Sequence, residues 1–128
     1  MGTYAISLFR TYGGYLTLTG IWALIDVDSF MRVTGPKTDI WMVKTLSLMF
    51  TSMGLTFLLA AYLGEGKLLF SVLGFFTCAS VLGIDVYYSL NEVIWKVYLI
   101  DGFMQMLFLA GFIMLLKQQS KQWKPAGR

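Results

Sequence analysis

The sequence predicts an all-α integral membrane protein, an antiparallel bundle of four transmembrane helices with both termini in the cytoplasm. Long apolar runs fill most of the 128 residues, hydrophobic residues make up 57% of the chain, and charged residues make up 13%. Soluble domains carry about 25% charged residues, whereas about 20 apolar residues cross a bilayer as a helix. The short connections leave room for a single domain. The expected spans are residues 4–25, 40–63, 68–90 and 94–116.

The first apolar run, residues 4–25, is expected to be retained as a span. A cleavable signal peptide ends in a small-residue cleavage site, whereas this run continues into Asp26-Val27-Asp28. Small and polar residues share one face of the run at helical spacing, and small residues let helices approach closely in a membrane. Arg10 on this face either points at a partner helix or extends to the cytoplasmic interface. The predicted helix-packing residues are Arg10, Gly13, Gly14, Thr17 and Gly20.

Residues 26–39 are predicted to form the longest aqueous segment. Gly35-Pro36 indicates a turn. Thr38-Asp39 is placed to cap the helix that begins near Ile40, because Thr and Asp side chains accept hydrogen bonds from the free backbone N–H groups of a first helical turn.

The second and third spans each carry a charge near the end that faces away from the cytoplasm. Lys44 lies about one turn into span 40–63, where it either reaches the interface or faces inward. Asp85 lies near the end of span 68–90 and shares a face with Gly74 and Cys78. Its short carboxylate either reaches the interface or belongs to an interior contact.

Asp101 is the most informative charge in the chain. It lies about two turns into span 94–116, roughly 10 Å deep, on a polar stripe with Tyr98 and Gln105. An isolated carboxylate at that depth takes up a proton, so we expect Asp101 to be neutral and hydrogen-bonded or paired with Lys44. It serves either as a contact between helices or as a titrating or ligand-binding group. The candidate ligand- or ion-binding residues are Asp101, Lys44, Asp85, Tyr98 and Gln105.

The sequence excludes several kinds of chemistry. It contains one cysteine, Cys78, so neither an internal disulfide nor a paired-cysteine redox site can form. It contains no histidine, which excludes His-ligated haem and His-based metal sites. We therefore expect no cofactor, no metal and no catalytic residues.

The distribution of charge predicts the orientation. We call the side of both termini side A and the opposite side side B. Side A is assigned six basic residues and one acidic residue, and side B four basic and six acidic residues. Because basic residues near span ends favour the cytoplasm, side A is expected to be cytoplasmic, in the inner membrane of a bacterium. Residues 117–128 form a basic tail suited to anionic headgroups, so the basic character gives no reason to expect a nucleic-acid partner.

Three classes of function are compatible with these patterns. The leading expectation is an accessory or interaction subunit, because the small chain lacks a catalytic constellation and is not expected to be an enzyme. The alternative is a proton- or cation-coupled transporter or channel for a small solute, with Asp101 and Asp85 as candidate ion sites. A third is a protein or enzyme that binds a lipid or another apolar ligand. Beyond the lipid bilayer, the expected partners are further copies of the chain or a larger membrane complex.

Overall fold

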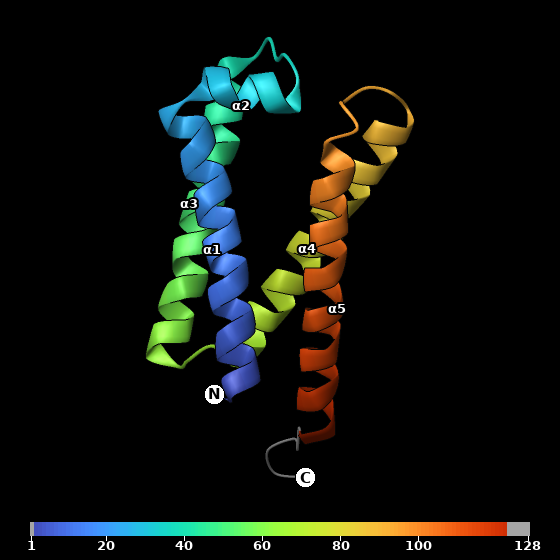
Figure 1. Cartoon of the computed structure of the whole chain (residues 1–128). Helices are drawn as coiled ribbons and strands as arrows, with labels where there is room; N and C mark the ends of the chain where they lie inside the picture. The colour runs from blue at the N-terminus through green and yellow to red at the C-terminus, as the bar shows by residue number, and fades with distance from the viewer. Residues whose placement is uncertain (1, 123–128) are drawn as a thin grey trace.

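The computed structural model describes residues 2–122, which form five helices joined by turns and loops. Four long helices run alternately up and down, and the start of the first, the turn between the third and fourth, and the end of the fifth lie at one end (Figure 1). The all-α class predicted from the sequence is confirmed. The helices are α1 (Thr3–Ile25), α2 (Val27–Thr34), α3 (Ile40–Leu63), α4 (Lys67–Leu90) and α5 (Tyr98–Gln122).

Three of these helices are long and apolar enough to cross a membrane. Their mean hydropathy reaches 1.7 in α3, 1.9 in α4 and 2.0 in α5. These helices correspond to the predicted spans 40–63, 68–90 and 94–116. Three helices of this length and hydropathy indicate a membrane protein. Helix α1 has 23 residues but is not among the three, because Arg10 and several Gly, Thr and Tyr residues lower its hydropathy.

The predicted start of the fourth span at residue 94 is wrong, because α5 begins only at Tyr98. Residues 91–97 instead form a turn that folds back on the end of α4. The N–H groups of Val93 and Ile94 both donate to the Tyr88 carbonyl oxygen, at 2.9 and 3.3 Å. Glu92 adopts a positive φ of 60°, a conformation that does not continue a right-handed helix.

The segment 26–39 contains a helix that the sequence analysis did not predict. The Asp26 side chain accepts a hydrogen bond from the Ser29 N–H at 3.0 Å and so caps α2. Trp22 of α1 donates from Nε1 to Ser29 Oγ at 3.1 Å. The chain turns at Gly35, as predicted, with a φ of 103°. Asp39 precedes α3, but its side chain makes no capping hydrogen bond, so the predicted side-chain cap is absent there.

Helices α1 and α3 pack so closely that side chains are excluded from part of their contact. A Cβ atom on Gly13 would lie 2.7 Å from the Gly54 carbonyl oxygen, and one on Gly20 would lie 2.5 Å from that of Ser47. Thr17 is also buried there. Gly14 has open space around it and Arg10 is exposed. Three of the five predicted packing residues therefore lie in the contact with α3, and Gly14 and Arg10 do not.

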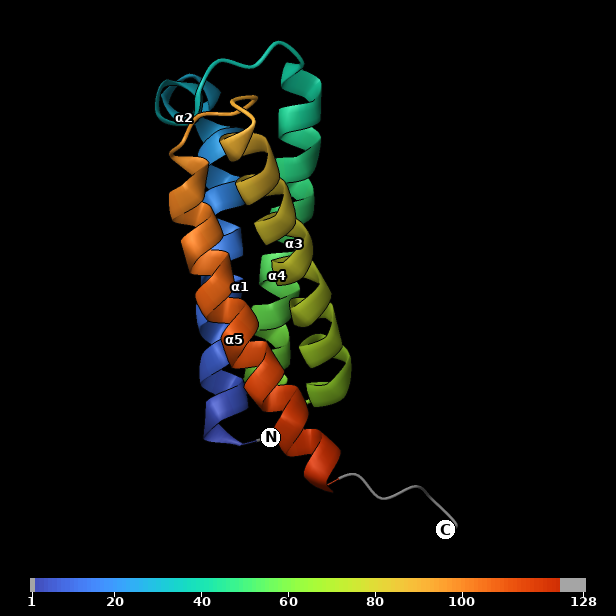
Figure 2. The same ribbon diagram turned by 90° about the vertical axis from the view of Figure 1, so that its right-hand side faces the viewer.

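Aromatic side chains fill the core toward the end where α1 begins. Phe9, Phe57 and Phe70 pack with ring centroids 5.3–6.1 Å apart, within the range favoured by tilted and edge-to-face pairs. Phe112 of α5 packs on Phe9 and Phe57 and against Gly74 of α4. We call Phe9, Phe57, Phe70 and Phe112 the aromatic cluster. It joins the α1–α3 pair to the α4–α5 pair, which form two layers in Figure 2.

Candidate functional site

Polar side chains from three helices meet on the side B half of the molecule, beyond the aromatic cluster. Each helix contributes residues that share one face by helical spacing. We call this group the carboxyl cluster: Tyr12 and Tyr15 from α1, Cys78 and Asp85 from α4, and Asp101 and Gln105 from α5.

Two phenol groups of α1 donate hydrogen bonds to α5. The Tyr15 hydroxyl donates to Asp101 Oδ1, and the Tyr12 hydroxyl donates to Gln105 Oε1 at 3.2 Å. Tyr12 is fully buried and Gln105 is 2% exposed. In such a site a neutral donor and acceptor satisfy each other, as buried polar groups must.

Asp85 is the second carboxyl group of the cluster, and it is 4% exposed. It faces Gly102, the residue that follows Asp101 in α5, where an added Cβ would be 3.4 Å from the Asp85 Cβ. Its Oδ2 atom is buried and has no hydrogen-bond partner within residues 2–122. One turn further along α4, the buried Ser89 Oγ is also without a partner there.

The two carboxyl groups lack a compensating positive charge among the described contacts. Asp101 receives its hydrogen bond from a neutral phenol, and the Lys96 ammonium binds the Ser89 carbonyl oxygen at 3.4 Å. Like charges that are close together in a poorly solvated interior repel each other more strongly than in water. Two neighbouring carboxyl groups in such a place favour a protonated or cation-bound state over two free carboxylates.

The structure brings together three of the five residues that the sequence singled out, namely Asp101, Asp85 and Gln105. Lys44 is exposed on α3. Because α3 lies diagonally across from α5 (Figure 2), Lys44 does not pair with Asp101. Of the two predicted alternatives for Asp101, the structure therefore has a hydrogen bond, donated by Tyr15, in place of the ion pair. Tyr98 lies apart from the cluster, with the Lys37 ammonium 5.3 Å from its ring centroid.

Sequence reasoning missed Tyr12 and Tyr15. Both residues lie within the first apolar run. A spacing of three residues places the two tyrosines on one face of a helix, and a buried tyrosine hydroxyl generally requires a hydrogen-bond partner. These two points together are the signal from which the pair could have been predicted. Residues 2–122 contain no group of three or more His, Cys, Asp or Glu side chains that could hold a metal ion.

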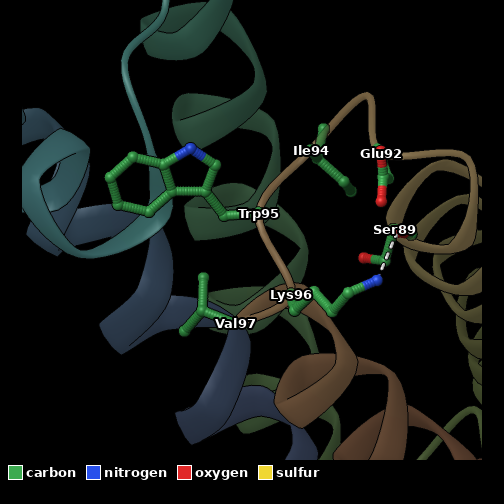
Figure 3. A pocket seen from close by; sticks show the side chains of 6 residues that line it. All are labelled: Ser89, Glu92, Ile94, Trp95, Lys96 and Val97. Carbon is green, nitrogen blue, oxygen red and sulfur yellow. Dashed lines mark hydrogen bonds between the residues drawn. The ribbon is translucent and has the colours of Figure 1, made fainter.

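An open pocket of about 460 Å³ lies at the side B end of α4, where the chain turns toward α5 (Figure 3). The Lys96 side chain reaches across it to Ser89. The ring of Trp95 packs on Gly35 of the α2–α3 loop, so the loop that lines the pocket also contacts the α1–α3 pair. The pocket is lined by Ser89, Glu92, Ile94, Trp95, Lys96 and Val97.

Comparison of the chain with protein-family models, with curated proteins and with solved structures found no match.

Proposed function

We propose that α1 is a fourth transmembrane helix, so that the chain forms a four-helix antiparallel bundle with both termini in the cytoplasm. Eight residues of α1 are buried, whereas α3 and α4 bury five each. A helix that faces protein over much of its surface needs less apolar surface for lipid, which accounts for its lower hydropathy. Its 23 residues are long enough to span the hydrocarbon core, and the excess of basic residues on side A supports the orientation.

We propose that the protein is a transporter or channel for a small solute, coupled to a proton or a small cation that binds between Asp85 and Asp101. The observation that supports this proposal is the uncompensated pair of carboxyl groups at the meeting point of α1, α4 and α5. Ionisable residues within membrane spans typically mark ion or proton pathways. Because four short helices leave little room for a pore in one copy, the functional unit is proposed to be an oligomer.

The experiment reconstitutes the protein in liposomes that contain a pH-sensitive dye and imposes a potassium diffusion potential. Proton flux is measured with external choline, sodium or potassium, which separates proton movement from coupling to each cation. The titratable side chains of Tyr12, Tyr15 and Cys78 belong to the same cluster, and Lys96 lies at Ser89, one helical turn away; all four remain in place in the two variants of this experiment. Asp101→Asn should abolish the flux, whereas Asp28→Asn on the exposed face of α2 should leave it unchanged.

A second measurement tests the binding site without requiring flux. A protonated carboxyl group has an infrared C=O band that a carboxylate lacks, and this band should respond to pH or to added cation in the native protein. The part of this response that belongs to the pair should be present in the native protein and absent from both Asp85→Asn and Asp101→Asn. The same response in the native protein and in both variants, together with unchanged flux in Asp101→Asn, would exclude the proposed ion site.

The accessory or interaction subunit is the second candidate. It is favoured by α5, whose last turns extend beyond the start of α1 and the α3–α4 turn (Figure 2) and carry the exposed residues Lys117 and Lys121. Such a projecting basic helix end could dock on a partner at side A. Purification of the tagged protein in mild detergent should then recover a stoichiometric partner. Recovery of the chain alone, or only with further copies of itself, would count against this function.

A further inference from the structure

The pocket at the side B end of α4 adjoins the carboxyl cluster through a single helical turn. Ser89 lines the pocket, and Asp85 lies four residues earlier on the same buried face of α4. Both side chains carry a buried oxygen without a hydrogen-bond partner in the described part of the chain, Ser89 Oγ and Asp85 Oδ2. Buried oxygens of this kind are normally satisfied by protein or by ordered water. These two oxygens lie one turn apart on the same buried face of α4.

Lys96 lies beside Ser89 at the wall of the pocket. Ser89 is fully buried, although it contributes to the pocket wall. The Lys96 ammonium is held at 3.4 Å from the Ser89 carbonyl oxygen, and the Lys96 residue as a whole is exposed. A flexible, exposed lysine that is held by one long hydrogen bond requires little free energy to be displaced.

We propose that the carboxyl pair is reached from side B through this pocket, with Lys96 as a displaceable gate over Ser89. A hydrated proton or a small monovalent cation would pass from the mouth, where Glu92 lies, along Ser89 to Asp85. The inference rests on the proposed function, since the species that passes is the one held by Asp85 and Asp101.

The opposite end of the same helix face of α4 is packed differently. Gly74 is covered by the Phe112 ring, and the aromatic cluster lies at this level. Beyond it, Ser71 is fully buried like Ser89, but its Oγ donates to the Lys67 carbonyl oxygen and accepts from Gln119 Nε2 at 3.0 Å. Ser71 and Ser89 thus match in residue type, helix and burial and differ in access and hydrogen bonding.

This difference provides the test, because the chain has a single native cysteine that can be removed as Cys78→Ser. In that background, Ser89→Cys and Ser71→Cys are exposed in oriented membrane vesicles to a membrane-impermeant, cationic thiosulfonate added from side B. Ser89→Cys should react with the cationic reagent. Its reaction rate should be roughly tenfold higher than with an anionic thiosulfonate, because acidic groups lie along the route. Ser71→Cys should not react. Adding Lys96→Gln should accelerate the reaction at residue 89.

Two results would overturn the route: no reaction at residue 89 even with Lys96→Gln, or equal reaction at residues 71 and 89. These results test the access route and not the proposed ion site between Asp85 and Asp101. If residue 89 reacts as expected but the carboxyl infrared band does not respond to pH or cation, the pocket is an access route that does not serve the proposed function. If the band responds but residue 89 is inert, the ion site stands and access occurs elsewhere.

Discussion

The Tyr15 hydroxyl donates a hydrogen bond to the Asp101 carboxyl group and so joins α1 to α5 at the carboxyl cluster. This contact crosses between the two helix pairs. The pairs are also joined by the hydrogen bonds of Tyr12 to Gln105 and of Tyr4 to the Gly111 carbonyl oxygen, by the aromatic cluster, and by the packing of Trp95 on Gly35. The position of Asp101 relative to Asp85 therefore depends on a residue of the first helix.

Tyr15→Phe should destabilise the protein by about 1–3 kcal/mol, because it leaves a partly buried carboxyl group without its donor. Thermal unfolding in detergent measures the change, and the infrared C=O band of the carboxyl pair should shift. Tyr62→Phe is the matched control, since Tyr62 is 84% exposed. A shift of similar size in both variants would show that the Tyr15 hydrogen bond contributes nothing specific.

Gly13→Ala and Gly14→Ala, at adjacent positions of α1, should have opposite effects. The new methyl group at residue 13 would lie 2.7 Å from the Gly54 carbonyl oxygen, whereas at residue 14 nothing lies within 4 Å. Gly13→Ala should therefore cost about 1–3 kcal/mol through overpacking. Gly14→Ala should be neutral or slightly stabilising, since alanine restricts the unfolded chain. Unfolding temperatures of the two variants check this contrast, and equal temperatures would contradict the close packing of α1 on α3.

Asp85→Asn should raise the unfolding temperature at neutral pH while it abolishes ion-dependent flux. The substitution removes one of two neighbouring acidic groups and supplies an amide donor beside Asp101, so repulsion is replaced by a possible hydrogen bond. A gain in stability with a loss of activity is common where a site holds destabilising groups for function. Lower stability in Asp85→Asn would indicate that the carboxyl group makes favourable contacts that an amide cannot replace.

Gly35→Ala should destabilise the protein more than Gly64→Ala. Both glycines have positive φ, at 103° and 70°, but only Gly64 has the left-handed helical conformation that other residues tolerate at a modest energy. A Cβ on Gly35 would also approach the Trp95 ring at 3.0 Å, whereas one on Gly64 meets nothing within 4 Å. Denaturation curves should rank the native protein, Gly64→Ala and Gly35→Ala in decreasing order. The reverse order would mean that the Gly35–Trp95 contact is not needed for the fold.

The sequence predicted the apolar helices well because their length and composition are set by local physics. The bounds of α3 match the prediction of residues 40–63, and α4 begins one residue before the predicted span. Helix α2 and the late start of α5 depend on local contacts, such as the Asp26 cap and the hydrogen bonds to the Tyr88 carbonyl oxygen, and hydropathy does not report these.

The candidate site was predictable only in part. Asp85, Asp101 and Gln105 stand out as polar residues in apolar helices, whereas Tyr12 and Tyr15 resemble their apolar neighbours in a hydropathy pattern. Of the two alternatives predicted for Asp101, the ion pair with Lys44 is absent from the structure, because that alternative was based on depth alone. Two residues at one depth meet only if their helices are adjacent, and a single sequence does not reveal that α3 lies against α1 rather than α5.

The close packing of α1 on α3 has a consequence for how the protein is made. Helix α1 is only weakly apolar, and its glycines pack against the later helix α3. Transfer of α1 alone into lipid is therefore only weakly favourable. On the proposed topology, its stable integration must wait until α3 has left the ribosome. Nascent chains arrested before α3 emerges should therefore hold α1 at the insertion machinery, and slightly longer ones should release it into the bilayer as a hairpin.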